Sequence, residues 1–234
     1  MAKEKKGLTK AIIEGAFKKY KKLRDEPNAR ALSWEHCISQ FAAAFANPKK
    51  SASDEKTVDL LSLHLGFYLA SWGMERNSKL MDFDYKIHAP FVRTLMGYSD
   101  LFRKDLADFR DDPKAMERFK EMHEAVEKHC SQFSEAKGYR ASDILVSKII
   151  LGTLGIAPAY DRNVKKSVIK YGISGGKFSP KSFKELAYYF TENCFTEKWA
   201  DITERMTKEM QKLCPHYTRA KVIDGILWIL GLDA

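Results

Sequence analysis

Asp161 and Lys148 are the residues whose types and surroundings could do chemistry. Asp161 stands where a basic helix is expected to begin. A carboxylate there either caps the helix by accepting hydrogen bonds from its free N–H groups, or stabilises positive charge that develops on a bound molecule. Lys148 lies in an apolar stretch, where burial lowers the pKa of an amine and frees it to act as a nucleophile. The alternative for Lys148 is a buried cation paired with a nearby carboxylate, that of Asp143, Asp161 or Asp224.

The order of residues around Asp161 is specific enough to compare with a known family. An apolar helix is followed by Gly155, Pro158, Tyr160, Asp161, Val164 and Lys165. This order resembles the second half of the helix-hairpin-helix DNA glycosylase signature. The resemblance implies two helical lobes with a cleft between them, and a catalytic role for Asp161. The Gly-rich hairpin of the L-P-G-x-G type that this family carries is missing here, and Lys137-Gly138-Tyr139-Arg140 stands at about its place.

The chemistry implied by the resemblance is cleavage of an N-glycosidic bond. Positive charge then builds on the sugar, and a nearby carboxylate stabilises it. The base must leave the stack and enter a pocket lined by aromatic rings. His64, Tyr68 and Trp72 recur one helical turn apart and, with Tyr160, are the candidates for that pocket. The alternative is a core histidine hydrogen-bonded by its neighbours.

Composition favours an acidic partner. The 234 residues include 40 Lys and Arg against 31 Asp and Glu, a net charge of +9. Such a balance favours nucleic acid as the partner, DNA above all, and anionic lipid second. The alternative is a soluble protein with a lysine-rich surface and no acidic partner. The candidate nucleic-acid contacts flank the central motif: Lys137, Arg140, Arg162, Lys165 and Lys166. Lysines of the first helix could form a further electrostatic arm toward phosphates.

The remaining composition narrows the class of protein. A hydrophobic content of 44% excludes a wholly disordered chain. The four cysteines lack C-x-x-C spacing, which predicts free thiols, no metal site and no cofactor. Neither a signal peptide nor a membrane-length apolar run is visible, so we expect a cytoplasmic protein with no membrane partner. Composition leaves the oligomeric state open.

Hydrophobic periodicity predicts an all-α fold of about ten helices. Residues 55–72 and 144–154 are apolar nearly all round, so each is expected at the centre of a core. We predict one helical domain over residues 1–234; division into lobes of approximately 25–112 and 113–234 is the alternative. A short β-hairpin within 81–87 is also allowed.

The sequence thus predicts a nucleic-acid-binding helical protein, and the resemblance implies a DNA N-glycosylase that uses the carboxylate of Asp161 in a cleft; the sequence leaves open whether the protein is an enzyme. Two alternatives stay open. One is a non-enzymatic nucleic-acid-binding protein. The other is a helical protein of unrelated function, such as a defence or toxin component or a small-molecule binder, because a fold does not establish a function.

Overall fold

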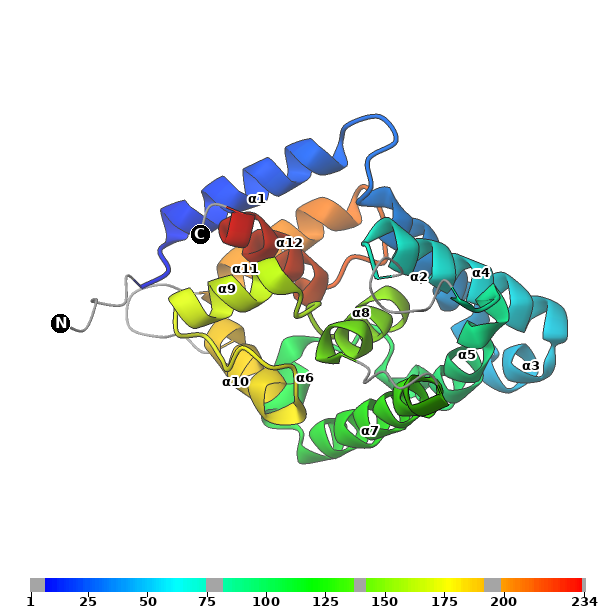
Figure 1. Cartoon of the computed structure of the whole chain (residues 1–234). Helices are drawn as coiled ribbons and strands as arrows, with labels where there is room; N and C mark the ends of the chain where they lie inside the picture. Colours follow the sequence, from blue (N-terminus) through cyan, green and yellow to red (C-terminus); the bar gives the residue numbers. More distant parts are fainter. Residues whose placement is uncertain (1–6, 75–81, 137–141, 192–198, 233–234) are drawn as a thin grey trace.

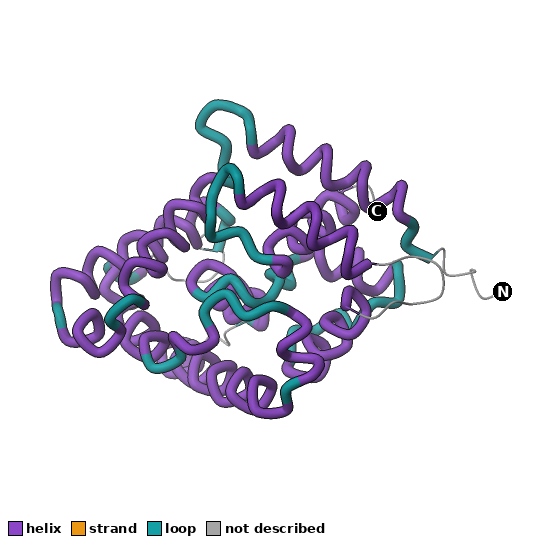
Figure 2. Tube along the Cα trace, turned by 180° about the vertical axis from the view of Figure 1, so that it is seen from behind, coloured by secondary structure: helices purple, strands orange, loops and turns teal. Residues whose placement is uncertain are grey.

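The computed structural model describes residues 7–74, 82–136, 142–191 and 199–232, and these ranges form helices joined by loops (Figures 1 and 2). The α-helices are α1 (Lys10–Arg24), α2 (Leu32–Phe45), α3 (Pro48–Ser53), α4 (Glu55–Ser71), α5 (Ala89–Met96), α6 (Leu106–Asp111), α7 (Pro113–Ala136), α8 (Asp143–Thr153), α9 (Arg162–Lys170), α10 (Pro180–Thr191), α11 (Trp199–Gln211) and α12 (Arg219–Leu232). Two short 3-10 helices are η2 (Tyr85–His88) and η3 (Ser99–Leu101).

The predicted all-α class is confirmed across the described ranges, none of which contains a strand. The described part of the allowed hairpin, 82–87, instead leads into η2, whose first residue is capped by Asp84. No described helix is both long and apolar enough to cross a membrane. Cys37 and Cys214 are buried free thiols, Cys130 is buried, and Cys194 lies outside the described residues.

Helices α8 and α12 are the most completely buried elements. Every residue of α8 from Leu145 to Thr153 is buried, and other helices surround α8 in Figure 1. In α12 the buried set runs from Ala220 to Gly231 with only Trp228 half-exposed. Burial on all sides matches the all-round apolar composition of both helices. The buried apolar residues form one cluster that draws on both halves of the chain.

Two glycines allow the core helices to approach their neighbours closely. A Cβ on Gly231 of α12 would lie 2.0 Å from the carbonyl oxygen of Asn163, so α9 and α12 meet backbone to backbone. A Cβ on Gly152 of α8 would lie 2.4 Å from the ring of Tyr68 on α4. These contacts bring α4, α8, α9 and α12 together around one point of the core.

The expectation of all-round burial is wrong for α4. Leu60, Leu63 and Phe67 are 46%, 47% and 63% exposed, whereas Leu61, Leu65 and Leu69 are buried. Helix α4 therefore packs on one side only. Its buried side also carries Tyr68, and its C-terminal cap is Trp72.

Candidate functional site

Asp161 is both a helix cap and an ion-pair partner. Its Oδ1 accepts the backbone N–H groups of Asn163 at 3.0 Å and Val164 at 3.1 Å, which caps α9. Its Oδ2 lies 3.5 Å from Nζ of Lys148 on α8. Of the three carboxylates expected as partners for Lys148, the structure thus selects Asp161. Because Oδ1 makes the capping hydrogen bonds, Oδ2 is available to pair with the amine of Lys148.

A second buried ion pair lies next to the first and comes from α12. Nζ of Lys221 lies 2.8 Å from Oδ2 of Asp224, and Oδ1 of Asp224 accepts the backbone N–H of Ala159 at 2.9 Å. Ala159 belongs to the segment that leads into Asp161. The bond to Asp224 therefore holds the segment that carries the first pair.

Aromatic rings and an arginine cover the two ion pairs. The guanidinium of Arg30 lies 4.5 Å from the ring centre of Trp72, and Nζ of Lys148 lies 5.1 Å from the same centre. Trp228 meets Trp72 edge-on at 5.8 Å between centroids. The cation–π contacts place Trp72 between an exposed arginine and the buried amines.

The cavity enclosed by these groups is small. It is lined by both ion pairs together with Tyr68, Trp72, Trp228, Leu151 and Ala159, and encloses about 10 Å³. That is close to the space one water molecule needs. Nε1 of Trp72 is buried here without a hydrogen-bond partner in the structure. A cavity of this size does not admit a nucleobase.

The pKa values of the two buried lysines shift in opposite directions. Burial lowers the pKa of Lys148, although the carboxylates of Asp161 and Asp224 oppose this and Lys221 reinforces it. Burial also disfavours the charge on Lys221, but Asp224 and Tyr20 together outweigh it and raise the pKa of Lys221. Lys148 is therefore the amine more readily deprotonated, as a nucleophile or base requires.

Only part of the predicted pocket lines the cavity. Tyr68 and Trp72 do, whereas His64 does not; partial burial, aided by nearby His36, lowers the pKa of His64. Tyr160 is buried, and its hydroxyl lies 2.9 Å from Oγ of Ser174 in the loop before α10. Burial raises the pKa of Tyr160 to about 12.

Sequence reasoning missed Trp228 and Arg30. Lys221 and Asp224 interrupt an otherwise apolar stretch of the sequence. Lys221, Asp224 and Trp228 are spaced three and four apart, which places them on one helical face. This spacing could have identified Trp228 from the sequence. Arg30 reaches the site from a loop, where residues have no such periodic spacing.

A continuous basic segment begins directly after Asp161. Seven cations and no carboxylate occur over residues 162–184, and we call this set the basic strip: Arg162, Lys165, Lys166, Lys170, Lys177, Lys181 and Lys184. It runs along α9, the following loop and the first turns of α10, which lie on the same side of the molecule in Figure 1. Arg162, Lys170, Lys177, Lys181 and Lys184 are exposed.

The predicted nucleic-acid contacts have different surroundings. Arg162 is exposed, but Lys165 is half-buried and lies 2.9 Å from a carboxylate oxygen of Asp143. Lys166 is half-buried and engaged in an interaction. Lys137 and Arg140 lie outside the described residues. The exposed charge therefore extends further toward α10 than the sequence predicted.

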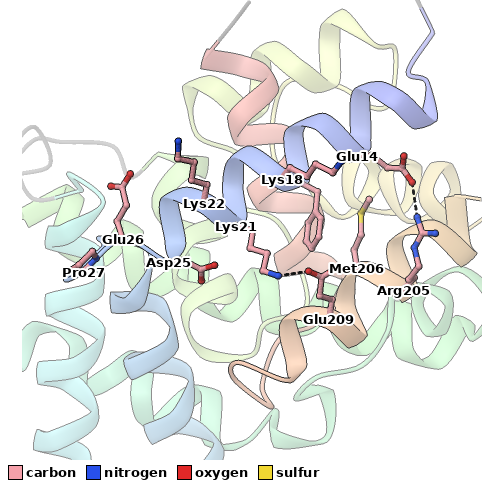
Figure 3. Close-up of a pocket in the computed structure, with 11 residues that line it drawn as sticks. Glu14, Lys18, Lys21, Lys22, Asp25, Glu26, Pro27, Arg205, Met206 and Glu209 are labelled. Carbon is pink, nitrogen blue, oxygen red and sulfur yellow. Dashed lines mark hydrogen bonds and ion pairs between the residues drawn. The ribbon is translucent and has the colours of Figure 1, made fainter.

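A larger groove of about 880 Å³ separates α1 from α11 (Figure 3). Its lining carries four acidic and four basic residues: Glu14, Asp25, Glu26, Glu209, Lys18, Lys21, Lys22 and Arg205. Lys21 pairs with Glu209, and Arg205 lies 2.7 Å from Glu14. This matched charge makes the groove a poor surface for a polyanion, which weakens the expected role of the first helix as an electrostatic arm.

Comparison with protein-family models, curated proteins and solved structures finds no match for this chain. Among the described residues, no group of three or more histidines, cysteines or acidic residues is arranged to hold a metal ion. The functional argument therefore rests on the buried ion pairs and the basic strip.

Proposed function

We propose that this protein binds nucleic acid through the basic strip. The observation that carries the proposal is the run of seven cations over residues 162–184 without a carboxylate, five of them exposed. Phosphate backbones are bound by such clusters because each neutralised phosphate releases counterions. The acidic residues of the α1–α11 groove make α1 a weaker alternative.

The test is fluorescence anisotropy with labelled DNA, comparing wild type with a variant that replaces Lys170, Lys177, Lys181 and Lys184 by Gln. We expect the variant to bind at least tenfold more weakly at low salt, because up to four phosphate contacts are lost. A control variant replaces Lys18 and Lys22 of α1 by Gln, and it should bind nearly as tightly as wild type. Equal binding by wild type and the strip variant contradicts the proposal.

A second candidate function is excision of a base by an N-glycosylase. It is favoured by the position of Asp161, which begins the helix that carries the strip and faces the buried amine of Lys148 at 3.5 Å. The carboxylate would stabilise an oxocarbenium-like sugar, and the amine, with its lowered pKa, could attack the sugar. The 10 Å³ cavity requires Trp72 to move aside before a base can enter.

Excision is tested with a panel of damaged-base oligonucleotides, using heat or alkali to reveal abasic sites. Asp161→Asn keeps a capping side chain but removes the charge, so it should fold, bind nucleic acid and lose excision by orders of magnitude. A wild type that excises nothing from a broad panel ends the glycosylase proposal but leaves the binding proposal intact.

A further inference from the structure

The basic strip contains exposed apolar side chains between its lysines. Ile169 on α9 is 59% exposed and Tyr188 on α10 is 38% exposed. Lys181, Lys184 and Tyr188 recur at intervals of three and four residues, so they share one face of α10. On α9, Arg162, Lys165 and Ile169 are likewise separated by three and four residues.

The aromatic rings lie next to strip cations. Nζ of Lys184 lies 5.8 Å from the ring centre of Tyr188, and Nζ of Lys170 lies 5.5 Å from that of Tyr171. Each pair presents a charge beside a ring. This is the combination that binds single strands, in which cations follow the backbone while unpaired bases stack on aromatic side chains.

The loop between the two helices is held in place rather than hanging free. A Cβ on Gly176 would lie 2.6 Å from Cδ1 of Ile169, so the loop packs onto α9. The backbone N–H of Gly175 donates to Glu185 of α10 at 3.2 Å. The loop carries Lys177, and its anchoring to both helices makes the strip one continuous surface.

We infer that the basic strip selects single-stranded nucleic acid, with Tyr188 as a stacking platform for an unpaired base; this rests on the proposed binding function. A duplex keeps its bases stacked inside, so Tyr188 and Ile169 would gain little from it. A single strand offers a base to Tyr188 and phosphates to Lys181 and Lys184. Chemistry on a base also needs that base outside the stack, which a single strand already provides.

The experiment measures binding of one labelled 15-nucleotide strand and of its duplex, at two salt concentrations. Wild type should bind the strand more tightly than the duplex. Tyr188→Ala should weaken strand binding roughly tenfold, as loss of one stacked base does, with little effect on the duplex. Tyr188→Phe keeps the ring and should bind like wild type. Phe67→Ala removes an exposed ring of α4 outside the strip and should change neither affinity.

Several outcomes overturn the inference. Equal or tighter duplex binding does so, as does a Tyr188→Ala variant that binds the strand like wild type. Tighter binding to anionic phosphatidylserine vesicles than to the strand, lost in Tyr188→Ala, would assign the surface to membranes instead. Duplex binding that equals or exceeds strand binding and depends on the strip lysines overturns only the single-strand inference. Absence of binding to either nucleic acid overturns the proposed function itself.

Discussion

Asp161 both caps α9 and faces the buried amine of Lys148, whereas its catalytic role stays a prediction. The chain order placed it at the start of α9, and the cap is present through Oδ1. The amine of Lys148 faces Asp161 because α8 packs beside the start of α9. Residue types and spacing therefore predicted the cap and a short set of partners, but only the fold selected among them.

The contribution of the cap to the free energy of unfolding can be measured separately from that of the negative charge. Asp161→Ala should lower the free energy of unfolding by about 1 kcal/mol more than Asp161→Asn, because Asn caps a helix about as well as Asp. Urea unfolding of the two variants followed by circular dichroism gives the difference. Equal stability of the two variants would show that the hydrogen bonds to Asn163 and Val164 contribute nothing.

Lys148 should give stability a pH dependence of definite sign. Its pKa is lowered in the folded protein, so between that value and the unfolded value of about 10.4 the unfolded chain binds more protons. Folding stability must then rise with pH across that window. Lys148→Met lacks this contribution, so the stability of wild type minus that of the variant should increase as pH rises toward 10.

The measurement is denaturant unfolding of both proteins at several pH values between 7 and 10. Lys221 and Asp224 are present in both proteins, so their titration largely cancels in the difference. A difference that stays flat, or that falls with pH, would contradict a lowered pKa for Lys148.

The burial of α8 and α12 agrees with their sequences, whereas that of α4 does not. All three have apolar residues on nearly every side, but only α8 and α12 are enclosed by neighbours. The composition of α4 cannot reveal that its Leu60, Leu63 and Phe67 side remains uncovered. Burial of a helix depends on how many other elements pack around it, and the sequence of that helix alone does not determine this number.

The contact between α9 and α12 makes a prediction at the level of elements. Gly231→Ala would place a Cβ 2.0 Å from the backbone oxygen of Asn163, so the helices must separate. We expect a loss of about 1–3 kcal/mol in the free energy of unfolding, as overpacking typically causes.

Gly15→Ala in α1 is the matched control for that contact. Its added Cβ meets nothing within 4 Å, and alanine favours the helix, so a gain of about 0.5–1 kcal/mol is expected. Urea midpoints of both variants give the comparison. A Gly231→Ala variant as stable as wild type would contradict the close approach of α9 and α12.

For the molecule as a whole, net charge predicted a basic surface but not its location. The lysines of the first helix are prominent in the sequence, yet Glu209 of α11 lines the same groove, as do Glu14, Asp25 and Glu26 on or directly after α1 (Figure 3). The strip over 162–184 keeps its exposed charge because no carboxylate intervenes along the chain. Charge matching between distant elements depends on packing, so the sequence could not rank these two surfaces.

Lysine footprinting by mass spectrometry tests the central claim most directly. The protein is acetylated briefly with and without a saturating DNA strand, and modification is quantified at each lysine. We predict that Lys170, Lys177, Lys181 and Lys184 are shielded by the strand, whereas Lys18 and Lys22 of α1 react equally in both samples. Shielding of the α1 lysines with unchanged reactivity across the strip would contradict the account.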